Sequence, residues 1–147
     1  MPSVTKEVFI TAPLKEIFDY AKIPSNLPQI WPSLVEINNE KLLDNGGYCF
    51  QWKYKMSGIT FKGAGEYTDI VPNLWLISNT HGDIESTHTW TFRFRDNKTR
   101  VTLTVDYRLP TQLVKRLGVF TLVKNEKEAE LILYNLRMKF ESRAKEN

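Results

Sequence analysis

Two histidines, His81 and His88, are the side chains whose ordinary pKa suits proton transfer near neutral pH. They stand on either side of a predicted turn at Gly82-Asp83. In one interpretation they share a strand face with Asn79, and they either orient the polar end of a ligand or form a proton-transfer pair. In the other they are solvated side chains of a hairpin whose register the sequence does not fix. A metal ion needs more ligands than two histidines, so we expect no metal site.

Other catalytic patterns are missing from the sequence. It contains no nucleophile elbow, phosphate loop, dinucleotide-binding glycine fingerprint or His-Glu-x-x-His motif. Cys49, Glu66 and Asp106 all fall on the outer parity of their strands, which argues against a thiol nucleophile and against a carboxylate pair. Asp69 has the inner parity, but it lies near a strand end where a bulge reverses parity. We therefore assign no catalytic residue and expect no cofactor.

Large rings recur at every second position of several segments, most clearly from Tyr48 to Met56. Because side chains of a strand alternate between its two faces, these rings point to one side. Such a face predicts either a ring-lined ligand pocket or a core that the rings fill completely. For the pocket, the predicted ligand-binding residues are Asn79, His81 and His88 together with seven aromatic residues, namely Trp52, Tyr54, Phe61, Trp75, Trp90, Phe92 and Tyr107.

Two glycines lie on the same apolar parity. A hairpin turn at Ser57-Gly58 places Gly63 opposite Trp52 and Gly65 opposite Phe50. Glycine weakens a strand, so its presence there indicates strong curvature of the sheet or room left above the rings.

The elements that would position these residues follow from periodicity and turn residues. Period-two patterns predict strands at 3–11, 34–43, 48–56, 59–71, 74–81, 87–95 and 99–109. Helices are predicted from Pro13 to Ala21, from Ser25 to Trp31, and from Thr111 to Asn147, where Gly118 marks a kink or a break. Consecutive strands joined by short turns form an antiparallel meander, and the helices must cover its apolar face.

Size and composition limit the function classes. The 147 residues predict a single domain, 1–147. The net charge of +3 is small and the charges are mixed in sign, which argues against nucleic acid as a partner. The single cysteine excludes an internal disulfide framework, and no apolar run is long enough to cross a membrane. We expect a cytoplasmic protein without a leader or a transmembrane segment.

Short motifs spread over the chain resemble the START-like (SRPBCC) superfamily, and within it the polyketide cyclase/dehydrase and lipid-transport group. They include Val8-Phe9-Ile10-Thr11-Ala12-Pro13, Ile17-Phe18-Asp19-Tyr20, Trp31-Pro32, Gly63-x-Gly65-x-Tyr67-Thr68, Tyr107-x-Leu109-Pro110 and Leu133-x-Asn135-Leu136. The resemblance implies an α+β helix-grip fold of the Bet v 1 type. In that fold a curved antiparallel sheet of about seven strands, with two short helices after the first strand, wraps around a long C-terminal helix.

Three functions stay open, because pocket residues vary with the ligand across such a family and the fold alone does not supply function. The first is binding or transport of a small hydrophobic ligand, such as a lipid, quinone, polyketide or aromatic compound. The second is an enzyme of the cyclase/dehydrase type, in which Tyr54, Tyr107 or the histidines move protons. The third is a protein-interaction module with a filled core, whose partner the sequence does not name.

Overall fold

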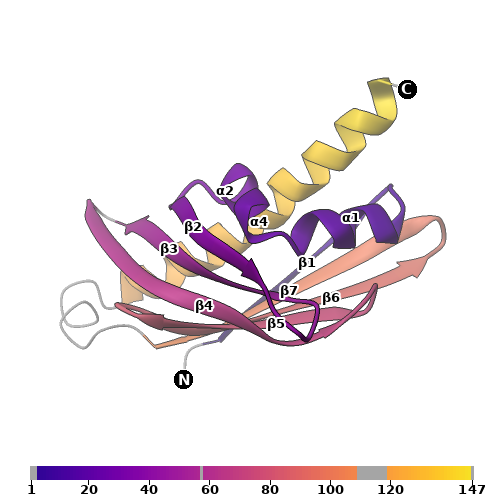
Figure 1. The fold of residues 1–147 in the computed structure, drawn as a ribbon. Coiled ribbons are helices and arrows are strands. Elements are labelled where there is room, and N and C mark those ends of the chain that lie inside the picture. The colour runs from indigo at the N-terminus through magenta and orange to yellow at the C-terminus, as the bar shows by residue number, and fades with distance from the viewer. Residues whose placement is uncertain (1–2, 57, 109–118, 147) are drawn as a thin grey trace.

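The computed structural model describes residues 3–56, 58–108 and 119–146, and in the last helix it describes the side chains of residues 126–142. These residues form a curved sheet with helices on one side (Figure 1). The first part of the predicted C-terminal helix, with Leu113, Leu117 and Gly118, lies outside the described residues, as do Leu109 and Ser57.

The sheet has seven antiparallel strands in the order β1-β7-β6-β5-β4-β3-β2. Strands β2 to β7 form a meander in which each pairs with the next, while β1 pairs with β7. The predicted strands are confirmed with ends that differ by a few residues. Their bounds are β1 (Ser3–Ile10), β2 (Leu34–Leu42), β3 (Tyr48–Met56), β4 (Ile59–Val71), β5 (Trp75–Gly82), β6 (Glu85–Arg95) and β7 (Lys98–Arg108).

The helices lie where the sequence predicts them. Helix α1 (Leu14–Ala21) follows Pro13, and a 3-10 turn (Pro24–Asn26) leads into the short helix α2 (Leu27–Ile30). Helix α4 (Val119–Glu146) lies on the same side of the sheet as α1 and α2, and its C-terminal end projects past the sheet (Figure 1). The predicted apolar stripe of α4 is buried at steps of three and four residues, at Ala129, Ile132, Leu133, Leu136 and Phe140.

The core consists of two main clusters of buried side chains. One joins α1, α4 and strands β6 and β7, with Phe18, Phe92 and Leu136 among its members. The other joins strands β2, β3 and β4 around the rings of β3. Leu27 and Trp31, at the two ends of α2, pack against both clusters. Helix α2 therefore bridges two cores on the concave face of the sheet.

The predicted pairing of the two glycines with rings is confirmed. Gly63 lies opposite Trp52 and Gly65 opposite Phe50. A Cβ atom at Gly63 would lie 2.4 Å from the Trp52 ring, and one at Gly65 would lie 2.7 Å from the Phe50 ring. The rings thus lie directly over the glycine backbone, which a larger residue would prevent.

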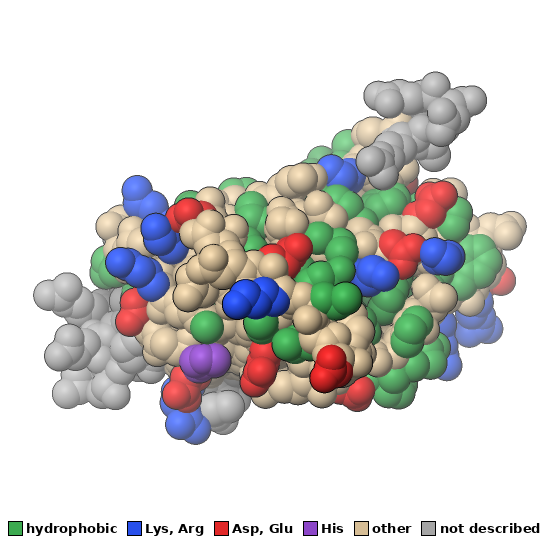
Figure 2. All heavy atoms as spheres, in the orientation of Figure 1, with side chains coloured by type: hydrophobic (Ala, Val, Ile, Leu, Met, Phe, Trp, Pro, Cys, Tyr) green, Lys and Arg blue, Asp and Glu red, His purple; other side chains and the backbone are tan. Residues whose placement is uncertain are grey.

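The surface carries charges of both signs. On the face shown in Figure 2, lysine and arginine side chains are interspersed with aspartate and glutamate and form no single basic patch. Several charged side chains of the molecule pair, for example Lys15 with Asp19 and Lys53 with Glu36. In the described part of the chain, no helix is both long and apolar enough to span a membrane.

Candidate ligand-binding cavity

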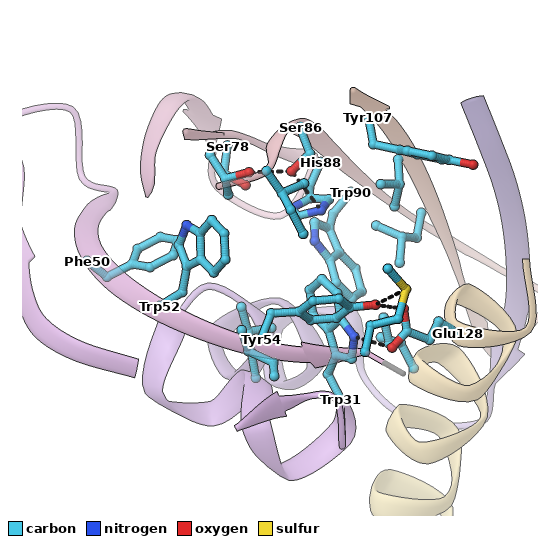
Figure 3. A pocket seen from close by; sticks show the side chains of 18 of the residues that line it. Trp31, Phe50, Trp52, Tyr54, Ser78, Ser86, His88, Trp90, Tyr107 and Glu128 are labelled. Atoms are coloured by element: carbon cyan, nitrogen blue, oxygen red, sulfur yellow. Dashed lines mark hydrogen bonds between the residues drawn. The ribbon is translucent and has the colours of Figure 1, made fainter. Parts of the chain in front are cut away.

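A cavity of about 90 Å³ lies between the concave face of the sheet and helices α2 and α4. Its wall takes side chains from both main core clusters, so it is the space where the two cores do not meet. Most of the wall consists of aromatic and aliphatic side chains (Figure 3). A volume of this size is on the order of several water molecules. Side chains therefore leave the space between sheet and helix partly open.

Five of the ten predicted ligand-binding residues line this cavity: Trp52, Tyr54, His88, Trp90 and Tyr107. Tyr107 contributes its ring, while its hydroxyl points away from His88 (Figure 3). That hydroxyl is buried without a hydrogen-bond partner among the described residues.

Two predicted residues have the expected face but lie behind the cavity wall. Phe92 is buried in the core and meets Phe18 edge to face, with ring centroids 5.3 Å apart. Phe61 is buried beside Tyr54, with centroids 6.4 Å apart. Both support the wall and do not line the cavity.

For three other residues the predicted face is wrong. Strand β5 pairs with β6 so that Leu76 lies opposite Trp90 and Ser78 opposite His88, which turns Leu76, Ser78 and Thr80 inward. Trp75, Asn79 and His81 therefore lie on the outer face. His81 and His88 are on opposite faces, so they form no proton-transfer pair.

A β-bulge in the neighbouring strand β4 accompanies this difference between the predicted and observed faces of β5. The pairing of β4 with β5 shifts between Tyr67 and Asp69, which carries Asp69 to the outer face as the sequence allowed. There Asp69 accepts a hydrogen bond of 2.9 Å from Trp75 Nε1. The ring of Trp75 thus has an outer-face partner, and its size does not indicate the buried side of the strand.

Glu128 is the main residue of the cavity that the sequence did not predict. It comes from α4, where it precedes the buried residues Ala129 and Ile132. Trp31 Nε1 donates to its Oε1 at 3.4 Å, and Tyr54 Oη donates to its Oε2 (Figure 3). The sequence feature that could have indicated this role is the position of Glu128 at the edge of the apolar stripe of the C-terminal helix.

The Tyr54 phenol is held in its protonated form. Burial raises its pKa far above the ordinary value, and the neighbouring negative charge of Glu128 raises it further. Tyr54 is therefore a hydrogen-bond donor at any physiological pH, and it fixes the position of the Glu128 carboxylate.

His88 marks a second polar region of the cavity wall. Its Nε2 lies 3.5 Å from Ser86 Oγ, which in turn bonds Thr80 Oγ1. The Trp31 ring meets it edge to face at 5.5 Å, the same ring that meets Tyr54 at 5.9 Å. Burial lowers the pKa of His88 to about 4, so the imidazole is neutral at neutral pH.

The polar groups can orient a ligand, but they do not form a hydrolytic triad. The Ser86–His88 separation is longer than the ~2.6–3.2 Å typical of an activated nucleophile, and Ser86 already bonds Thr80. What the cavity offers is the Glu128 carboxylate, the neutral His88 imidazole, the Tyr54 phenol and the hydroxyls of Ser78, Thr80 and Ser86 on an otherwise largely apolar wall.

Comparison with known proteins agrees with this architecture. Residues 1–141 match the family described as polyketide cyclase/dehydrase and lipid transport. The chain belongs to this family. No curated protein is similar enough in sequence to give a match.

Several solved structures share the fold of this polyketide cyclase/dehydrase and lipid-transport family member. TTHA0849 from Thermus thermophilus is 23% identical with a TM-score of 0.71, over 97% of this chain and 99% of that one. The Zhui aromatase/cyclase from Streptomyces sp. R1128 is 13% identical with a TM-score of 0.74, over 97% and 94%. A START superfamily protein from Mycobacterium smegmatis is 16% identical with a TM-score of 0.71, over 95% and 97%. At these identities the likeness concerns the fold.

In this family member, Tyr54→Phe is expected to lower the free energy of unfolding by about 2 kcal/mol, because the half-buried Glu128 loses a donor. Urea denaturation followed by tryptophan fluorescence measures the change. Tyr134→Phe is the matched control, since Tyr134 is exposed on α4 and its hydroxyl can bond water. Equal effects of the two substitutions would contradict the assigned role of the Tyr54 hydroxyl.

Proposed function

We propose that the protein binds a small, ring-containing apolar ligand in the cavity between the sheet and helix α4. The observation that carries this proposal is a cavity lined mainly by aromatic and aliphatic side chains, with polar groups concentrated around Glu128 and His88. Ligand sites are concave and largely apolar, with a few placed polar groups that fix orientation. Rings supply much contact area for little loss of side-chain entropy.

In this proposal the rings of Trp52, Tyr54 and Trp90 contact the apolar body of the ligand, together with the ring of Tyr107. His88 presents a neutral imidazole that donates or accepts one hydrogen bond, depending on its tautomer. The cavity of about 90 Å³ is smaller than the roughly 300–1,000 Å³ of sites for drug-sized ligands. The ligand class that fits without movement of the wall is therefore a compound of at most one ring.

A cavity-filling substitution tests the proposal. Val105 lines the cavity opposite His88, so Val105→Phe would place a ring in the space of the ligand. Native mass spectrometry of the protein purified from cells is expected to show a bound small molecule, retained less than one-tenth as well by Val105→Phe. Overpacking of this kind lowers the free energy of unfolding by about 1–3 kcal/mol.

The control is Val35→Phe, the same substitution at a half-exposed position of β2. It should retain the bound mass. Equal retention by both variants would place the ligand outside the cavity. Two results together would overturn the proposal. The purified protein would carry no bound molecule, and no ring compound at millimolar concentration would raise its melting temperature.

A second candidate is an enzyme of the cyclase/dehydrase type, which family membership and the polar groups of the cavity favour. Such a reaction needs a floppy carbonyl chain held in one folded form, with a proton donor and an acceptor nearby. In this version the Tyr54 phenol would keep its proton and donate a hydrogen bond to a carbonyl oxygen of the substrate, and the neutral His88 would be the proton acceptor. Unchanged turnover of a poly-carbonyl substrate by Tyr54→Phe and by His88→Gln would exclude this version.

The remaining hypothesis, an interaction module with a filled core, is disfavoured by the cavity itself. Cytoplasmic residence stays a prediction of the sequence.

A further inference from the structure

The part of the cavity wall that the structure describes has an unbalanced charge. Among the described residues that line it, Glu128 is the one with a formal charge at neutral pH, and none is lysine or arginine. His88 is neutral because burial lowers its pKa to about 4. No described lysine or arginine forms a salt bridge with Glu128. A ligand that enters therefore meets one negative charge without a positive partner on the described wall.

The Glu128 carboxylate has capacity left for a ligand. Trp31 donates to one of its oxygens and Tyr54 to the other. A carboxylate offers about four lone-pair positions, so each oxygen can accept another hydrogen bond. The two existing donors hold the group in place at the cavity wall, which lowers the entropy that a ligand would lose in ordering it.

Aromatic rings stand next to this carboxylate. The Trp31 and Tyr54 rings, whose polar atoms bond Glu128, meet each other edge to face at 5.9 Å. Both rings turn the edge that carries the polar atom toward Glu128, so they hold the carboxylate in place. The carboxylate itself suits an alkylammonium group, which gains a charge-assisted hydrogen bond there.

We propose that the ligand carries a protonated amine, bound at the Glu128 carboxylate beside the Trp31 and Tyr54 rings, with its apolar body among Trp52, Trp90 and Phe50. This inference rests on the proposed binding function and names the ligand class. It also excludes anionic ligands such as free fatty acids or aromatic carboxylates in the same pose. Such a ligand would bring a second negative charge next to Glu128 in a site of low dielectric, where like charges repel strongly.

A matched series of ligands separates this inference from the proposed function. Benzylamine, benzyl alcohol and benzoate have the same ring and differ in the charge of one substituent. Isothermal titration calorimetry at pH 7.5 measures each affinity. The amine is expected to bind about tenfold or more tighter than the alcohol, because hydrogen bonds to charged groups are the stronger ones. The carboxylate is expected to bind weakest.

Glu128→Gln tests the assigned group. The amide keeps an oxygen that accepts from Tyr54 and removes the charge, so the amine-to-alcohol affinity ratio should fall to near one. This ratio compares two ligands on the same variant, so a general loss of stability does not mimic the result. Glu126→Gln, which removes the same charge at an exposed position two residues earlier, should keep the ratio of the unmodified protein.

Three results count against the inference. A carboxylate that binds as tightly as the amine overturns it and leaves the binding function standing. The inference is also overturned, with the binding function left standing, if Glu128→Gln does not change the amine-to-alcohol affinity ratio. Absence of binding by all three compounds, at concentrations up to several millimolar, overturns the inference together with the proposed function.

Discussion

Gly63→Ala is expected to lower the free energy of unfolding by about 3 kcal/mol, at the upper end of the range for overpacking. The added Cβ would lie 2.1 Å from the backbone carbonyl oxygen of His81 and 2.4 Å from the Trp52 ring. Because the carbonyl belongs to the backbone of the neighbouring strand, β5 itself must move to make room. Alanine also restricts the unfolded chain, which stabilises by about 0.4–1 kcal/mol, so the clash is the larger effect.

Gly65→Ala is the matched comparison. Its Cβ would meet the Phe50 ring at 2.7 Å, and no backbone atom is among its three nearest contacts. A side chain can tilt away, so we expect a loss of about 1–2 kcal/mol. Urea denaturation of the two variants, followed by tryptophan fluorescence, measures both values. Gly63→Ala should in addition weaken ligand binding, since it displaces the Trp52 ring into the cavity. Equal stability of Gly63→Ala and the unmodified protein would contradict the close approach of β4 and β5.

The pairing behind this prediction was available from the sequence. The turn at Gly58 fixes the hairpin register, and period-two alternation then places the rings of β3 opposite the glycines of β4. In β3, in β7 and in the middle of β6, at Trp90 and Phe92, large apolar residues alternate with mostly polar ones, and the predicted inner face is confirmed there. Local patterns were sufficient there because burial on one face leaves a strong signal at each second residue.

The sequence of strand β5 indicates its inner face less clearly. Its inner face carries Leu76, Ser78 and Thr80, two of which are small and polar, while its outer face carries Trp75. Ser78 and Thr80 line the wall where space is left open. Because these inner positions carry small polar residues, β5 lacks the apolar pattern that identifies the inner face of other strands. The bulge between Tyr67 and Asp69 then shifted the parity of β4 relative to β5.

Glu128 could not be found from local patterns, because its partners are distant in sequence. Tyr54 lies 74 positions away and Trp31 lies 97 positions away. Periodicity gives the face of each element but not the position along α4 that meets a given strand. Trp31 belonged to a motif that resembles the family, yet its role at the cavity depends on α2 bridging the two core clusters.

His88 is expected to make the free energy of unfolding fall as the pH decreases from about 6.5 to about 4. Burial lowers its pKa in the folded protein to about 4, whereas an unfolded histidine has a pKa of about 6.5. Between these values the unfolded chain binds the proton more readily, so protonation favours unfolding. The contribution is fully present above about pH 6.5 and is lost as the pH falls toward 4.

The size of this effect is on the order of 3 kcal/mol, of which about 2 kcal/mol is lost by pH 5. The other titratable groups on the described cavity wall are Glu128 and the tyrosines Tyr54, Tyr67 and Tyr107. Exposed carboxylates contribute at lower pH. A hydrogen bond from Lys15 lowers the pKa of Asp19, and one from Asn38 lowers that of Glu36, so their contributions are lost below about pH 4.5. Measurements between pH 5 and 7.5 therefore isolate the histidine.

The comparison is between the unmodified protein and His88→Gln, in which the amide can still bond Ser86 but does not titrate. Urea denaturation at pH 7.5 and at pH 5 should give a loss of stability about 2 kcal/mol larger for the unmodified protein than for the variant. His81→Gln, the same change on the outer face, retains the His88 contribution and serves as the control. Equal losses for the unmodified protein and His88→Gln would mean that the imidazole is solvated. The cavity would then lack the enclosed imidazole that the proposed binding function uses to orient a ligand.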